Sequence, residues 1–188
     1  MPSLDDFLAP FALPRAVTVA VMVSSLDGRA TIGGRVGRLT GSADQLVLAT
    51  IREQAGAVVI GAGTHRTEGY GRLLDPKARE RRLENGLREE PELVVLRRNG
   101  PGITDVWREL RERHPERLIV SEGGPTMLGV ELENGLIDEL VLAVSPTLIG
   151  ARQESRVVEH ATPLGTALEF LACATAGGFV FLRHRVLP

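Results

Sequence analysis

The sequence has few of the residues on which cross-linked, metal-bound or nucleic-acid-binding proteins depend. Cys173 is its only cysteine among 188 residues, so neither an internal disulfide nor a thiolate metal cluster can form. Aromatic residues make up 4% of the chain and the net charge is −2, which argues against a stacking platform or a basic field for nucleic acid. We therefore expect no nucleic-acid partner and no metal site.

Long apolar runs are also absent. No stretch approaches the about 20 residues that cross a bilayer. The N-terminus carries Asp5 and Asp6, and Pro10 and Pro14 interrupt its apolar residues, which does not fit a signal peptide. We expect a cytoplasmic protein that binds no membrane. Cys173 lies in an apolar segment, which predicts a buried, inert thiol.

Short apolar segments alternate with segments of helical spacing. Strands are predicted over residues 16–24, 57–63, 92–96, 117–121 and 137–146, and helices over 42–54, 75–86, 104–114 and 125–135. Residues 167–187 contain two apolar runs around a glycine turn, which indicates a closing hairpin. The pattern predicts an α/β fold, with a mixed, mostly parallel sheet flanked by helices and an antiparallel C-terminal hairpin. We divide the chain into an N-terminal arm, residues 1–15, and a single domain, residues 16–188.

Two of the predicted strands end in glycine. GAGT follows the second strand, and EGGPT follows the fourth and leads directly into a helix. Ligands of parallel sheets lie beyond the carboxyl ends of the strands, where bare amides at a helix start suit a phosphate. The alternative is that these glycines only permit tight turns. Two such turns at one sheet edge favour a dinucleotide, although neither is the GxGxxG fingerprint.

Several motifs resemble the reductase domain of bacterial riboflavin biosynthesis. They are SSLDGRATIGG, LTGSADQLVLATIREQAGAVVIGAGT and LIVSEGGPTMLGVELENGLIDELVLAVSPTLIG, and the resemblance spans roughly residues 16–185. It implies a dihydrofolate-reductase-like fold, NADPH as cofactor, and reduction of the ribose of a phosphoribosylamino-pyrimidine. It also implies a homodimer formed through the late strands, whose apolar side chains would then be covered.

The resemblance assigns cofactor contacts to the first strand and to both glycine turns. The residues at those positions are Val23, Gly61, Gly63, Thr64, Gly123, Gly124, Pro125, Thr126, Met127 and Leu128. It assigns substrate contacts to Arg52 and Glu122, and Glu68, which we also place among the substrate residues, matches an acid that the family carries near the cofactor. Arg97 and Arg98 follow the third strand, where their guanidinium groups would suit the 2′-phosphate of NADPH. A solvated strand end is the alternative for these two arginines.

Two carboxylic acids, Asp27 and Glu122, are candidates for protonating the substrate, directly or through water. Asp27 also fits a simple turn, and Thr40 is either a helix cap or a substrate contact. The family's acidic-proline motif is missing from HRTEGYGRLLDP, and Arg72 is the candidate to replace its phosphate-binding arginine. Two other functions therefore stay open. One is a dihydrofolate-reductase-like enzyme for a pteridine, folate or other flat heterocycle. Tyr70 would then line the pocket for the flat ring, and its alternative is a position on an exposed loop. The other is a non-catalytic nucleotide-binding module.

Overall fold

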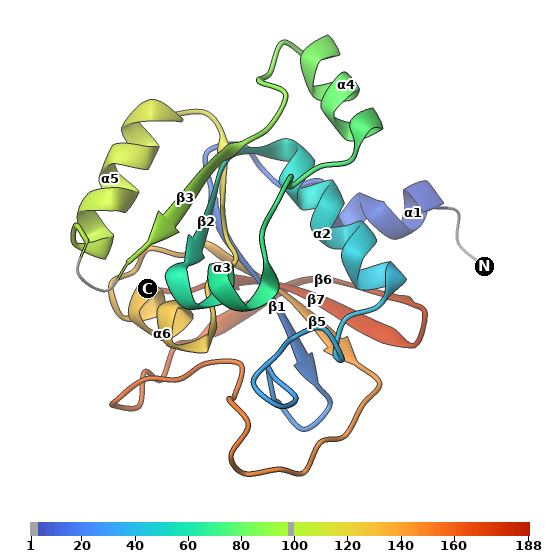
Figure 1. Ribbon diagram of the computed structural model, residues 1–188, viewed down its shortest axis with the longest axis vertical. Coiled ribbons are helices and arrows are strands. Elements are labelled where there is room, and N and C mark those ends of the chain that lie inside the picture. The colour runs from blue at the N-terminus through green and yellow to red at the C-terminus, as the bar shows by residue number, and fades with distance from the viewer. Residues whose placement is uncertain (1–3, 98–99) are drawn as a thin grey trace.

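The computed structural model describes residues 4–97 and 100–188, so Arg98 lies outside the described residues. These residues form one seven-stranded sheet of order β3-β2-β4-β1-β5-β7-β6 (Figure 1). The strands are β1 (Thr18–Ser25), β2 (Ala55–Gly61), β3 (Glu92–Leu96), β4 (Leu118–Ser121), β5 (Glu139–Ser145), β6 (Leu168–Ala176) and β7 (Phe179–Val186). Strands β1 to β5 pair in parallel, whereas β7 runs antiparallel to both β5 and β6. The predicted fold class and the C-terminal hairpin are confirmed.

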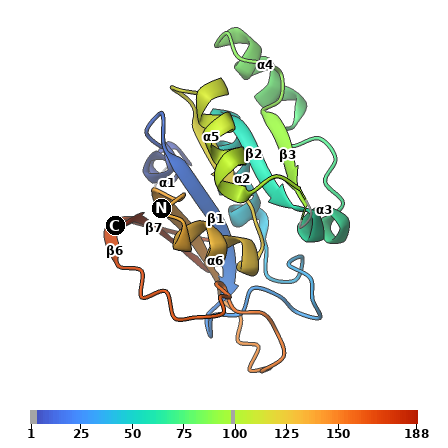
Figure 2. The ribbon, with the colours of Figure 1, turned by 90° about the vertical axis from the view of Figure 1, so that its left-hand side faces the viewer.

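Helices cover both faces of the sheet (Figure 2). On one face lie α1 (Leu4–Leu8), the 3₁₀ helix η1 (Ala9–Phe11) and α2 (Ser42–Gln54). The other face is covered by α5 (Ile103–Arg113) and α6 (Pro125–Glu133), while α3 (Ala62–Glu68) and α4 (Pro76–Glu84) follow β2. None of the described helices combines the length and the apolar composition of a membrane span.

The central strands are buried on both faces because successive side chains alternate across a sheet. Val58 and Ile60 of β2 pack in the cluster beneath α2, whereas Ala57 and Val59 pack against Trp107 of α5. Burial of each large aliphatic side chain contributes about 1.5–3 kcal/mol. This packing fixes the sheet edge at which β1, β2 and β4 end.

Residues 4–11 of the expected arm are helical and pack onto the sheet. The rings of Phe7 and Phe11 lie edge-to-face on Phe181 of β7, with centroids 5.6 and 5.8 Å away. Arg183 donates a hydrogen bond of 2.9 Å to the carbonyl oxygen of Pro10. The segment therefore contributes to the same core as β7.

Two local predictions were wrong. The second strand ends at Gly61, and α3 occupies residues 62–68, for which no helix was expected. This helix has no buried residue and stops where Gly69 adopts a φ of 65°. Cys173 is exposed rather than buried, since β6 is the outermost strand of the sheet.

Candidate active site

The carboxyl ends of β1, β2 and β4 meet at one edge of the sheet, where three cavities adjoin. The inner cavity, of about 450 Å³, lies between α2, the end of β1 and the turn after β4. The turn groove, of about 590 Å³, runs between the two glycine turns, and the arginine cavity, of about 870 Å³, lies between α3 and β3. The turn groove shares Thr64, Gly124 and Pro125 with the inner cavity, and Gly63, Leu96 and Arg97 with the arginine cavity. The three cavities therefore lie side by side along this end of the sheet.

A buried ion pair forms one wall of the inner cavity. Arg52 donates to both carboxylate oxygens of Glu122, through Nε at 2.6 Å and Nη2 at 2.5 Å. The Tyr70 hydroxyl donates to Glu122 at 2.8 Å, and the Arg52 guanidinium lies 5.5 Å from the centre of the Tyr70 ring. Burial and the charge of Glu122 raise the pKa of Tyr70 far above its usual value, so the phenol keeps its proton. Arg52 and Glu122 reach the site as predicted, but each neutralises the other.

Asp44, in the first turn of α2, also lines the inner cavity. Its side chain is almost fully buried, and burial raises its pKa from 3.8 to about 6 despite the opposing charge of Arg52. Asp44 is thus a group in the cavity that can hold and release a proton near neutral pH. The sequence offered only a weak signal for it, because an acid in the first turn of a helix is common.

Asp27 does not fit the role of substrate proton donor for which it was a candidate. It lies outside the residues that line the three cavities, and its carboxylate accepts hydrogen bonds from the amides of Ile149 and Gly150 and from the Ser25 hydroxyl. The bond from Ile149, with those from Ser25 and Gly150, holds the pKa of Asp27 far below its usual value. The turn-forming alternative fits this geometry, since a carboxylate so held has no proton to give.

Asp27 and Glu154 tie two long loops together from opposite sides. The pocket loop, residues 26–41, follows β1, and the outer loop, residues 146–167, follows β5 (Figure 1). Asp27 of the pocket loop binds the outer loop, and Glu154 of the outer loop accepts bonds from the Gly33 amide and the Thr31 hydroxyl, both at 2.7 Å. Thr31 lines the inner cavity, so this reciprocal contact positions part of its wall.

Gly123 and Gly63, one from each turn, lie in different surroundings. A side chain at Gly123 would lie 2.7 Å from Met127, so this glycine is required by packing within the protein. A side chain at Gly63 would meet no atom within 4 Å, and its φ is not in the left-handed region. The open space at Gly63 therefore faces the turn groove. Leu128 packs its side chain in the core beneath α6 and turns it away from that groove.

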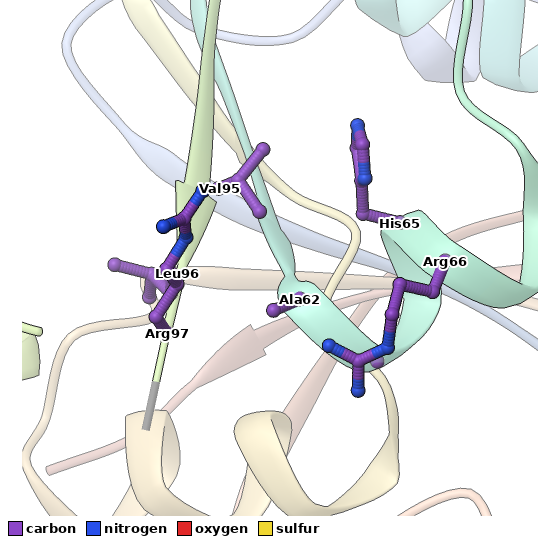
Figure 3. Close-up of a pocket in the computed structure, with 7 residues that line it drawn as sticks. Ala62, His65, Arg66, Val95, Leu96 and Arg97 are labelled. Carbon is purple, nitrogen blue, oxygen red and sulfur yellow. The ribbon is translucent and has the colours of Figure 1, made fainter. Parts of the chain in front are cut away.

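The arginine cavity is lined by cations on both sides. Figure 3 shows Arg66 projecting from α3 and Arg97 from the end of β3, with His65 nearby. In the described part of the chain, no acidic side chain pairs with Arg66 or Arg97. The cavity therefore suits an anionic group, and guanidinium is the side chain that best fits a phosphate.

Comparison with known proteins identifies the chain. Residues 16–181 match the RibD C-terminal domain. The chain belongs to this family. Membership indicates a reductase. A search among curated proteins found no match.

Solved structures share the fold of this RibD C-terminal domain. A pyrimidine reductase-like protein from Corynebacterium diphtheriae is 20% identical, with a TM-score of 0.80 over 96% of this chain and 95% of the other. The riboflavin biosynthesis reductase Rib7 from Saccharomyces cerevisiae is 17% identical, with a TM-score of 0.66 over 99% of this chain and 100% of the other. Dihydrofolate reductase from Enterococcus faecalis, complexed with NADP(H), is 11% identical, with a TM-score of 0.57 over 92% of this chain and 98% of the other. The fold is therefore dihydrofolate-reductase-like.

Apart from Asp27, Leu128 and the undescribed Arg98, the predicted site residues of this RibD C-terminal domain fall into two groups. The inner cavity is lined by Val23, Thr40, Arg52, Thr64, Glu68, Arg72, Glu122, Gly123, Gly124 and Pro125. The turn groove is lined by Gly61, Gly63, Thr64, Arg97, Gly124, Pro125, Thr126 and Met127. Sequence reasoning missed Asp44 and Arg66. Arg66 escaped notice because α3 has no apolar periodicity and was not expected to be a helix.

Three of the predicted substrate residues line the inner cavity and contact polar neighbours in the protein. Thr40 accepts a hydrogen bond of 2.9 Å from Gln45, and Glu68 accepts one of 3.3 Å from the amide of Val36. The side chain of Arg72 is 67% exposed and lies 3.3 Å from Glu89. A surface ion pair of this kind is weak, so Arg72 can reorient toward a ligand.

Proposed function

We propose that this RibD C-terminal domain is an NADPH-dependent reductase of a pyrimidine-type substrate. The substrate we propose is 5-amino-6-(5-phosphoribosylamino)uracil, which would place the enzyme in riboflavin biosynthesis in the cytoplasm. The observation that carries the proposal is the junction of the turn groove with the inner cavity at Thr64, Gly124 and Pro125. A hydride passes only between groups held in contact, and cavities that share lining residues are close enough to support that arrangement.

The turn groove and the arginine cavity supply what a dinucleotide phosphate needs. The amides of Thr126 and Met127 lie in the first turn of α6, where helix N–H groups lack partners within the helix. Arg66 and Arg97 supply positive charge in the adjoining cavity, where we place the 2′-phosphate. The space at Gly63 lets a ligand approach the backbone closely.

The residues of the inner cavity support proton transfer and orientation. Bound NADPH would supply a hydride to an electrophilic carbon, and the reaction then consumes a proton. We assign the proton to Asp44, because its pKa of about 6 leaves about a tenth of it protonated at pH 7. The pair of Arg52 and Glu122, braced by Tyr70, forms a rigid polar wall that orients the substrate ring.

One observation favours a second candidate, a reductase of a flat heterocycle such as a pteridine or a folate. The cations that line the inner cavity, Arg52 and Arg72, both have acidic partners, while Asp44 is a buried carboxyl suited to a ring nitrogen. The pyrimidine proposal requires Arg72 to leave Glu89 and bind the substrate phosphate. The heterocycle alternative makes no such demand.

Substrate-dependent oxidation of NADPH tests these functions. The substrates are the phosphoribosylamino-pyrimidine, the same compound without its phosphate, and dihydrofolate. Loss of about tenfold or more in kcat/KM on removing the phosphate supports the proposal, since one arginine contact accounts for that much. Equal turnover without the phosphate, or faster turnover of dihydrofolate, favours the heterocycle. Binding of NADPH without turnover of any substrate would identify a non-catalytic module.

We also propose a homodimer formed through β6 and β7. Cross-strand partners share a face, which places Phe170 opposite His184 and Cys173 opposite Leu182 on one side of the hairpin. Phe170 is 58% exposed and Leu168 is 44% exposed on the outermost strand of the sheet. A strand with an open edge and apolar side chains favours pairing with another chain. A second copy of this chain is the partner we propose.

A further inference from the structure

Glu131, on the buried side of α6, is a carboxyl group that the proposed reaction does not use. Its relative exposure is 0%, and Met127 and Val130 of the same helix line the turn groove. Its partner is Ser121, the last residue of β4, whose hydroxyl oxygen lies 2.7 and 2.9 Å from the two carboxyl oxygens. The same hydroxyl oxygen accepts a hydrogen bond of 3.4 Å from the amide of Gly123. A single serine thus connects Glu131 to the glycine turn.

The hydrogen count of this cluster favours a neutral carboxyl. Ser121 has one hydroxyl hydrogen, which serves one of the two carboxyl oxygens. A neutral Glu131 fills the second short contact with a hydrogen of its own, donated back to the serine oxygen, whereas an ionised carboxylate must share the single serine hydrogen between its two oxygens. Burial acts in the same direction, since it raises the pKa of Glu131 from 4.5 to about 8 while the bond from Ser121 opposes it.

Charged groups on the elements around Glu131 are engaged elsewhere. On α6 and the outer loop, Glu133 and His160 pair with each other at 3.2 Å. On α5, Arg111 binds the Arg117 carbonyl and the Thr18 hydroxyl. Among the described residues, only Ser121 makes a hydrogen bond to the Glu131 carboxyl. An ionised Glu131 would therefore stand without a counter-charge.

We propose that Glu131 is a positioning residue whose neutral carboxyl, acting through Ser121, sets the shape of the Gly123 turn and thereby the affinity for the cofactor. The inference rests on the proposed binding of NADPH in the turn groove. Loss of the proton would leave the single Ser121 hydrogen to serve both oxygens of Glu131, and would leave a negative charge in an enclosed site. Either the side chain or α6 must then shift, and the charge itself would repel the diphosphate.

Binding of NADPH at pH 7 and pH 9 tests the proposal, with Glu131→Gln as the matched variant. Glutamine keeps the size and both hydrogen bonds of the neutral acid but cannot ionise. We expect wild-type affinity to fall about tenfold between these two pH values, following the neutral fraction of Glu131, and the variant to change by less than about twofold. An equal fall in both proteins would overturn the proposal, because other groups would then cause it.

An NMR titration without cofactor separates this inference from the proposed function. The amide shift of Gly123 is expected to titrate with a midpoint near pH 8 in the wild type and to stay constant in Glu131→Gln. Ser121→Ala removes the link, so the same amide should also lose its titration in that variant. A Gly123 amide that does not titrate in the wild type would overturn the proposal. Failure of every protein to bind NADPH would instead remove the proposed function, while the amide titration still decides whether Glu131 shapes the turn.

Discussion

Arg52 and Glu122 are 70 residues apart in the sequence, yet they form a two-point ion pair with contacts of 2.6 and 2.5 Å. The pair joins the last turn of α2 to the turn after β4, and so fixes the helix against the sheet edge. Their side chains are 15% and 5% exposed, which makes the pair nearly dry. Each partner is therefore tolerated in the interior only because the other is present.

Replacing one partner of this pair is expected to lower the free energy of unfolding much more than replacing both. Glu122→Gln removes the carboxylate that binds the buried Arg52 guanidinium at two points, and the free energy of unfolding should fall by about 3–5 kcal/mol. The double variant Arg52→Met with Glu122→Gln should recover much of that loss, because the guanidinium is removed together with its partner. Denaturation in urea measures all the variants, including Arg52→Met alone. Strictly additive losses would show that the two side chains do not stabilise each other.

Asp44→Asn is expected to lower activity and raise stability at the same pH. The folded-state pKa of Asp44 is raised to about 6, so its contribution to stability is present below its ordinary pKa of 3.8 and is lost as pH rises through 6. Asparagine avoids the buried charge, and the variant should therefore unfold at higher temperature than the wild type above pH 6. Turnover should be lower in the variant than in the wild type. Wild-type turnover should decline above pH 6, whereas that of the variant should not.

The control for this experiment is Asp105→Asn, an exposed first-turn acid on α5. It should change neither the pH profile nor the melting temperature appreciably. A wild-type activity that does not vary between pH 5 and pH 8 would contradict the assignment of the proton to Asp44.

The sequence predicted the sheet well because its strands are continuous apolar segments. Val58 and Ile60 could be assigned to a buried strand from composition alone, but its end was predicted two residues too late, at Gly63 instead of Gly61. Nothing local predicted α3, since its residues AGTHRTE bury no side chain and its position is fixed by Gly69 and the preceding strand. Arg66 was missed for that reason.

The site was harder to predict because its chemistry comes from contacts across the chain. The glycine turns were visible as motifs, but the pairing of Arg52 with Glu122 depends on how α2 packs on the sheet. The raised pKa of Asp44 depends on burial, which a first-turn acid does not reveal. Asp27 stood in a conspicuous motif, and only the outer loop shows that its carboxylate is already engaged.

Preference for NADPH over NADH should depend on Arg66 and Arg97. A hydrogen bond to a charged group contributes about 1.5–3 kcal/mol, so either alanine variant should weaken NADPH binding by about 10- to 150-fold. Binding of NADH, which has no 2′-phosphate, should change little in the same variants. Fluorescence titration with both cofactors gives the ratio. The control is Arg108→Ala on α5, whose guanidinium pairs with Asp105 at the surface. Equal loss of NADH affinity would show that these arginines do not read the phosphate.

Glu154→Gln is expected to loosen the pocket loop without unfolding the protein. The hydrogen bond from Thr31, with those from the amides of Gly33 and Gly34, lowers the pKa of Glu154, so the contact is present above its ordinary pKa and lost only as pH falls through the lowered value. The variant should show faster hydrogen exchange at Gly33 and a severalfold higher KM for substrate, with a smaller change in kcat. Wild-type KM should be independent of this group between pH 6 and pH 9. Glu159→Gln, also on the outer loop, is the control, and an identical effect from it would remove the specific role of Glu154.

Phe170→Glu is expected to convert the homodimer into a monomer. Phe170 is 58% exposed on β6, and a charge there would have to be buried by the second copy without a partner. Leu83→Glu provides a matched control, because Leu83 is 56% exposed on α4, away from the hairpin. Sedimentation velocity should give a dimer for the wild type and the control, and a folded monomer for Phe170→Glu. In the dimer Cys173 should react slowly with a thiol reagent, whereas in the monomer it should react rapidly because it lies exposed on β6. A wild-type protein that sediments as a monomer at high concentration, with a readily modified Cys173, would mean that this face of the hairpin is not an interface.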